Sequence, residues 1–94
     1  MFRAVVLLFI LCPFSVSGQN VRIDSLRNEL VHISSSEKQV DLLNEIAFLN
    51  ISIDPLTAKD EVLKAYNIAK EVAYVGGQSR ALVVMGGIHW SLAD

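Results

Sequence analysis

The sequence predicts an all-α protein, and two observations carry that prediction. Apolar residues recur at intervals of three and four positions in four successive segments after residue 18. Residues that cap or end helices, chiefly serine, aspartate, proline and glycine, fall between those segments. We therefore expect antiparallel helix pairs.

Residues 1–18 have the layout of a secretory signal peptide. Arg3 precedes an apolar run over residues 4–11, and small residues follow up to Gly18. The run is much shorter than the roughly 20 residues that span a bilayer. We expect cleavage after Gly18, or after Ser17 as the neighbouring choice. An uncleaved N-terminal anchor is the alternative.

Composition narrows the function of the remaining segment, residues 19–94. The one cysteine, Cys12, lies in the signal segment, and Ile10 and Leu11 before it do not suit a lipidation site. The mature chain therefore has no disulfide. Its seven Lys and Arg against ten Asp and Glu give a net charge of 7 − 10 = −3. Without a basic patch we expect no nucleic-acid binding, and without a second long apolar run no direct membrane insertion.

The first two helices are predicted from apolar residues that line up on one side of a helix and from residues that cap helix N-termini. Over residues 23–33, Leu26, Leu30 and Ile33 form one stripe, and Asp24 is the expected N-cap. The next helix is expected to start at Ser36, with Gln39 closing a capping box, and to run to about Ile51. Its expected buried face is wide: Val40, Leu43, Ile46, Ala47 and Asn50, broadened by Leu42 and Leu49.

The third helix is predicted to open with Asp54 as cap and Pro55 at the first helical position. We expect Glu61 and Lys64 to pair on its outer side, and Gly76–Gly77 to supply its left-handed end. Its inner stripe is predicted to be Val62, Ala65, Tyr66, Ala69, Val72 and Ala73.

The fourth segment, residues 78–92, also fits the helical period. Its predicted stripe is Ala81, Leu82, Met85, Ile88, His89 and Leu92. Gly86 and Gly87 each cost about 1 kcal/mol relative to alanine in a helix. Close approach of another helix at this glycine pair would explain that cost.

The stretch KAYNIAKEVAYVGGQSRALVVMGGIHWSLAD resembles tetratricopeptide (TPR) repeats, most closely the long-period type found in exported regions of bacterial signalling proteins. The resemblance assigns Leu82, Met85, Gly86 and His89 to the first helix of a repeat, with His89 in place of the usual tyrosine. Leu43, Ile46 and Ala47 occupy the same positions about 39 residues upstream, with Asn50 at the aromatic one. Ala65, Tyr66 and Ala69 match the second helix.

This resemblance implies a short superhelical solenoid. Residues 19–35 would be an N-terminal capping helix, and residues 37–94 about one and a half repeats, the last one truncated. The chain is therefore expected to be the N-terminal fragment of a longer protein. The TPR resemblance further implies a non-catalytic scaffold that binds protein or peptide, exported to the periplasm or the cell exterior.

Two alternatives stay open. In the first alternative, the chain would be the first part of the sensory region of a membrane signalling protein, tethered by a downstream transmembrane helix. Its output domain, a histidine kinase, nucleotide cyclase or DNA-binding domain, would then lie beyond residue 94. In the second alternative, the chain would be a small exported helical protein, complete as it stands and stabilised by self-association.

No residue pattern predicts catalysis, a metal site or a cofactor. His32 and His89 are far apart, and Asp41 with Glu45 is the usual arrangement of a solvated helix face. LVVMGGIH lacks the full fingerprint of a phosphate-binding loop. Asn50 begins a glycosylation sequon. Trp90 is the one residue that we single out as a partner contact.

Overall fold

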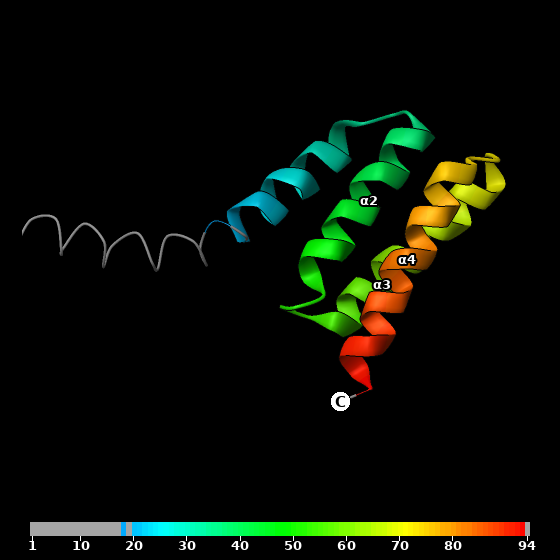
Figure 1. The fold of residues 1–94 in the computed structure, drawn as a ribbon. Coiled ribbons are helices and arrows are strands. Elements are labelled where there is room, and N and C mark those ends of the chain that lie inside the picture. The colour runs from blue at the N-terminus through cyan, green and yellow to red at the C-terminus, as the bar shows by residue number, and fades with distance from the viewer. Residues whose placement is uncertain (1–17, 19, 94) are drawn as a thin grey trace, which may run out of the picture.

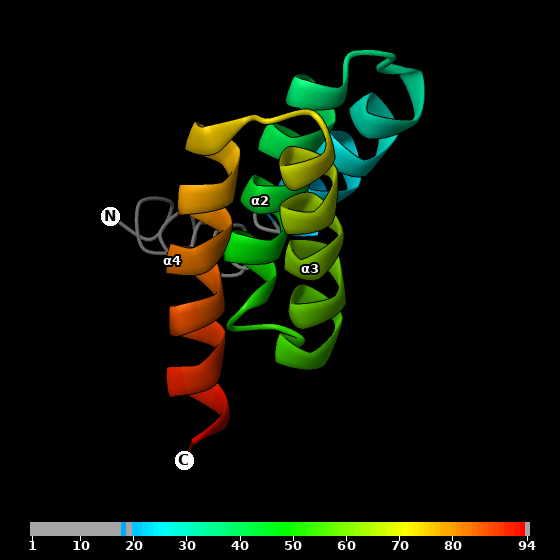
Figure 2. The same ribbon diagram turned by 90° about the vertical axis from the view of Figure 1, so that its right-hand side faces the viewer.

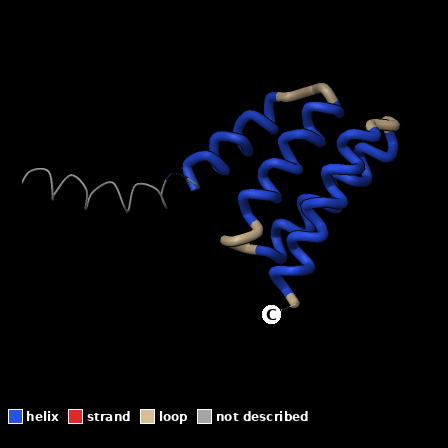
Figure 3. The backbone as a smooth tube through the Cα atoms, in the orientation of Figure 1, coloured by secondary structure: helices blue, strands red, loops and turns tan. Residues whose placement is uncertain are grey.

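The computed structural model describes residues 18 and 20–93, and every regular element among them is a helix (Figure 3). Residues 20–32 are helical, and α2 (Ser36–Asn50), α3 (Pro55–Glu71) and α4 (Val75–Leu92) follow. Successive helices run in opposite directions (Figure 1). The all-α prediction is confirmed. Apart from Gly18, the predicted signal peptide lies outside the described residues.

Helix α2 lies in the middle of the bundle, between residues 20–32 on one side and the α3–α4 pair on the other (Figure 1). The predicted wide buried face is confirmed. Leu42 is buried, and so are all five residues named for the centre of that face: Val40, Leu43, Ile46, Ala47 and Asn50. Residues 20–32 cover the side that carries Leu42 and Ile46, using Ile23 and Leu26. The side that carries Val40 and Leu43 packs against the alanines of α3.

Small residues let α3 approach its neighbours closely. Ala58, Ala65 and Ala69 are fully buried, and Val62 between them is also inaccessible to solvent. One core cluster joins α2, α3 and α4. Burial of each of its larger aliphatic side chains stabilises the fold by roughly 1.5–3 kcal/mol. The members of this cluster are Ala47, Ala58, Val62, Ala81, Val84 and Ile88.

Two predicted N-caps are wrong in position. Asp24 lies within the helical residues 20–32 and is exposed, so it does not begin that helix. Helix α2 is capped by Ser35 rather than Ser36, and the Ser35 side chain accepts a hydrogen bond from the backbone N–H of Lys38. Gln39 donates to the carbonyl of Ile33 instead of closing a capping box. Three consecutive serines offer equivalent caps, and the path of the preceding turn selects one.

Helix α3 begins as predicted and ends earlier than predicted. Asp54 caps it by accepting from the backbone N–H of Thr57, and Pro55 occupies the first turn. The left-handed residue after it is Ala73, with φ of 57°, not Gly76 or Gly77. The N–H of Tyr74 bonds to the carbonyl of Ala69 and that of Ala73 to Lys70, which is the Schellman pattern.

Because α3 ends early, α4 starts at Val75 and includes the first glycine pair. A Cβ atom on Gly77 would lie 2.5 Å from Cγ1 of Val40, so the backbones of α2 and α4 approach closely there. No atom of a neighbouring element or side chain lies within 4 Å of a Cβ placed on Gly86. The predicted close approach is therefore not made at Gly86 within the described chain. A Cβ atom on Gly87 would lie 3.4 Å from Cδ1 of Ile51, which is an ordinary contact, and the tight approach is at Gly77 instead.

Candidate protein-binding surface

Helix α4 forms one edge of the described bundle, and its outward side is apolar (Figure 2). We define the outer face of α4 as Val75, Leu82, Val83 and Trp90, whose exposed fractions are 70%, 55%, 76% and 79%. Ser79 and Gly86 lie between them on the same side of the helix. Side chains of this size, exposed together on one helix, are typical of a protein contact surface.

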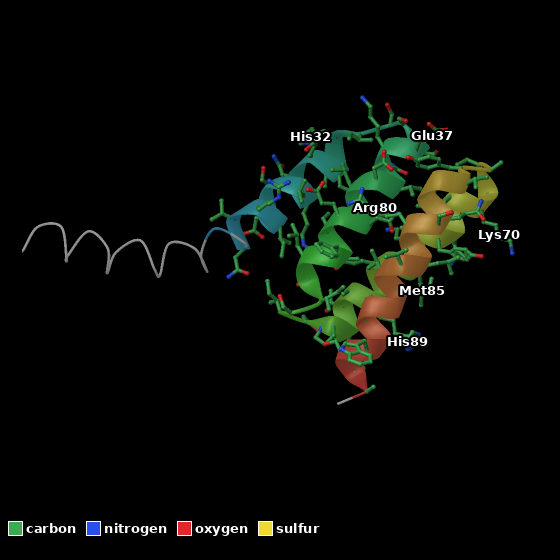
Figure 4. The ribbon with its side chains drawn as sticks, in the orientation of Figure 1. His32, Glu37, Lys70, Arg80, Met85 and His89 are labelled. Carbon is green, nitrogen blue, oxygen red and sulfur yellow. The ribbon has the colours of Figure 1, made fainter. Side chains whose placement is uncertain are left out.

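The outer face exists because α4 is apolar nearly all round. Its buried stripe, Gly77, Ala81, Val84 and Ile88, packs toward α2 and α3. Arg80 is the only residue of α4 with a formal charge at neutral pH. Arg80, which is labelled in Figure 4, lies on the side of α4 that faces Tyr74, where its positive charge acts to lower the pKa of the Tyr74 hydroxyl. The outer face itself therefore carries no charge.

The residues assigned to the repeat signature divide into two groups. Leu43, Ile46, Ala47, Ala65 and Ala69 are buried, while Tyr66 and Met85 are half-buried against the core.

The remaining three, Leu82, Gly86 and His89, are exposed. Three residues predicted for the inner stripe of α4 are exposed instead, namely Leu82, His89 and Leu92. In Figure 4, Met85 and His89 lie along one edge of α4. Val72 and Ala73, predicted for the inner stripe of α3, are exposed as well.

Trp90 lies two turns after Val83 on α4, and most of its indole ring is exposed. An exposed tryptophan combines a large apolar area with few rotatable bonds, so its burial by a partner has a low entropic cost. The position of Trp90 is therefore compatible with the partner contact predicted for it.

A buried polar cluster was missed in the sequence. Glu61 is nearly buried between helices, accepts a hydrogen bond from Nδ2 of Asn50 at 3.0 Å, and lies 2.9 Å from Nη1 of Arg27. The predicted Glu61–Lys64 surface pair is therefore wrong. The same contacts place the nitrogen of the Asn50 sequon inside the fold, where a glycan has no room. The signal was the helical period, which places Glu61 beside Val62 and Ala65 at the edge of the buried stripe.

Asp41 and Glu45 do not form a joint acid–base site. Asp41 accepts a hydrogen bond from the hydroxyl of Tyr74 at 2.7 Å, whereas Glu45 pairs with Arg22 at 2.5 Å. The bond to Asp41 raises the pKa of Tyr74, and partial burial and the charges of Asp41 and Glu37 add to the effect. Asp41 thus joins α2 to the residue that precedes α4, and Glu45 joins α2 to the helical residues 20–32.

The two histidines lie at opposite ends of the bundle (Figure 4). The Nδ1 atom of His32 is 2.8 Å from the carbonyl oxygen of Asn28, and His89 is on α4. Over residues 18 and 20–93, no group of three or more His, Cys, Asp or Glu side chains is arranged to hold a metal ion. LVVMGGIH lies wholly within α4, so the phosphate-loop alternative is wrong.

Comparisons of the chain with protein families, curated proteins and solved structures find no match. In the described part, no helix combines the length and the apolar character that a membrane crossing requires.

Proposed function

We propose that this chain is an exported, non-catalytic helical scaffold of the TPR type that binds protein through the outer face of α4. The uncharged cluster of Val75, Leu82, Val83 and Trp90 carries this proposal. Four apolar side chains that lose their contact with water on binding provide a driving force of roughly 25 cal/mol per Å². Binding of a charged small molecule would need polar groups that this face lacks.

The helical-repeat part of the proposal is supported by packing. Antiparallel neighbours meet through small buried residues, Ala47 on α2 and Ala65 and Ala69 on α3, as stacked helix pairs require. Such stacks leave the outermost helix with an uncovered apolar side, and α4 is in that position here.

Photo-cross-linking in the exporting cell tests protein binding. A benzophenone amino acid replaces Trp90, and in the control it replaces Val31, which is 80% exposed on the other side of α2. We expect specific protein adducts from position 90 that disappear when Leu82→Asp is added, and none from position 31. Equal labelling at both positions, or adducts that Leu82→Asp leaves unchanged, would contradict the assignment of this face.

Export is tested separately. The proposal rests on Arg3, the apolar run over residues 4–11 and the small residues up to Gly18. Intact-mass measurement of the chain recovered outside the cytoplasm should show a mature protein starting at Gln19. Retention of Met1 in a chain that stays in the cytoplasm would refute export without affecting the binding proposal.

A further inference from the structure

We infer that the outer face of α4 binds a second copy of this chain, with the two α4 helices packed antiparallel about a twofold axis. The inference rests on the proposed function, because it names the partner of the same surface. Three properties of the face lead to it: its charge, the order of large and small residues along it, and its area.

Charge favours self-association at this face over any other. The chain is acidic overall, with a net charge of −2, so two copies repel one another across most of their surfaces. Residues 20–32, α2 and α3 each carry exposed charged side chains, whereas the outer face of α4 has none. Two copies can therefore meet through α4 without bringing like charges together.

The order of residues suits an antiparallel pair. Positions 75, 79, 82, 86, 89 and 93 alternate in steps of four and three, which is the spacing of a seam between two packed helices. An antiparallel pair centred on position 84 places Leu82 of each copy opposite Gly86 of the other. The same register places His89 opposite Ser79 and Ala93 opposite Val75.

Each of these layers joins a larger residue to a smaller one. The space beside Gly86 is open, so it can accept a leucine side chain from a second helix. The register also brings Trp90 of each copy near Gly76 of the other, where the surface is again small. A parallel pair would instead stack Leu82 on Leu82 and Gly86 on Gly86, which leaves a void in one layer and crowds the other.

The available area is close to what a dimer needs. The exposed parts of Val75, Leu82, Val83 and Trp90 amount to roughly 500–600 Å², against about 800 Å² per partner in a standard interface. Ser79, Gly86 and His89, all exposed on the same side, supply much of the difference. The seam is about 27 Å long, and no other described helix lies outside α4 (Figure 2).

Sedimentation equilibrium tests the inference on protein made from the full 94-residue sequence, with its N-terminus read by intact mass. We expect a dimer for the unchanged chain. Leu82→Asp should weaken dimerisation by roughly 100-fold or more, because it buries two carboxylates near the axis. Leu56→Asp is the matched control, since Leu56 is 66% exposed on α3, and it should leave the dimer intact.

A second pair of variants tests the antiparallel register. Gly86→Leu fills the recess opposite Leu82 of the other copy, so it should weaken the dimer while circular dichroism shows unchanged or greater helicity. Leu82→Ala combined with Gly86→Leu restores a large residue opposite a small one and should recover dimerisation. A parallel pair predicts no weakening by Gly86→Leu.

Each outcome is decisive. A folded monomer at every concentration overturns the inference, and so does a dimer that Leu82→Asp leaves unchanged. In either case adducts from position 90 to a different protein would still support the proposed function. Failure of both experiments would remove α4 as a binding surface altogether.

Discussion

The side-chain amide of Asn44 donates a hydrogen bond to the backbone carbonyl of Gly77, 3.2 Å away, although the two residues are 33 positions apart. Asn44 is fully buried, and its Oδ1 has no hydrogen-bond partner among the described residues. The bond joins the middle of α2 to the first turn of α4. It is made where the missing side chain of Gly77 lets the two backbones come together.

Gly77→Ala should destabilise the protein even though alanine favours helix. The new methyl group would lie 2.5 Å from Cγ1 of Val40, a buried and stiff side chain, and 2.7 Å from the ring of Tyr74. Overpacking of this kind costs about 1–3 kcal/mol, which exceeds the gain in helix propensity. Chemical denaturation followed by circular dichroism measures the change.

Gly86→Ala is the matched control for that substitution. It lies in the same helix, its Cβ would meet no neighbour, and it should stabilise the protein by about 0.5–1 kcal/mol. Both variants are compared in the Leu82→Asp background, so that association does not contribute. If the two alanines had the same effect, the close contact at Gly77 would be ruled out.

Glu61→Ala should lower the free energy of unfolding by about 2–3 kcal/mol. It removes the acceptor of the buried amide of Asn50 and leaves Arg27 without its ion-pair partner. Glu71→Ala, on the exposed side of the same helix, should change stability by less than about 0.5 kcal/mol. Equal, small effects in the two variants would show that the Glu61 cluster is not part of the packed structure.

Ala73→Gly should stabilise the protein by about 1 kcal/mol. Ala73 holds a left-handed backbone with φ of 57°, where a Cβ atom is crowded and glycine is not. Ala93→Gly serves as the control, because Ala93 is in the right-handed helical region at the end of α4. It should be neutral or slightly destabilising in the same denaturation experiment. A loss of stability with Ala73→Gly would contradict the Schellman geometry.

Asp54 should make the start of α3 sensitive to acid. Hydrogen bonds from the side chain and the backbone N–H of Thr57 lower the pKa of Asp54 in the folded protein. Its ionised form therefore favours folding at pH values above the unfolded pKa of about 3.9, and this contribution is lost as the pH falls through the folded-state pKa. The difference in melting temperature between the unchanged chain and Asp54→Asn should be constant near neutral pH. It should change only below about pH 4, and a change centred near neutral pH would refute this cause.

The helices that sequence analysis places best are those with one polar side and an unambiguous cap. Asp54 followed by Pro55 locates the start of α3, and the broad apolar face of α2 correctly indicates cover on two sides. The end of α3 was missed because glycine is the usual left-handed residue and Ala73 takes that role here. Among three adjacent serines, local composition cannot distinguish Ser35 from Ser36.

The inner side of α4 could not be predicted for a different reason. The helix is apolar nearly all round, so the helical period fits the stripe through Leu82 and His89 as well as the one through Ala81, Val84 and Ile88. Only the positions of α2 and α3 decide which stripe is buried. The partner contact predicted at Trp90 stays a prediction. The Glu61 cluster could not be predicted from local sequence, because it depends on contacts with Asn50 and Arg27 in distant segments.

The two edges of the bundle differ in character, and that difference limits how large an assembly can grow. Beyond α2, residues 20–32 expose charged side chains such as Arg22 and Asp24, whereas α4 exposes apolar ones at the opposite edge. Contact between unlike edges would repeat without end and produce filaments. Contact between two α4 edges uses up both apolar surfaces at once and leaves charged edges outward. In the proposed dimer such a contact closes at two copies, so the surface of α4 that drives association would also end it.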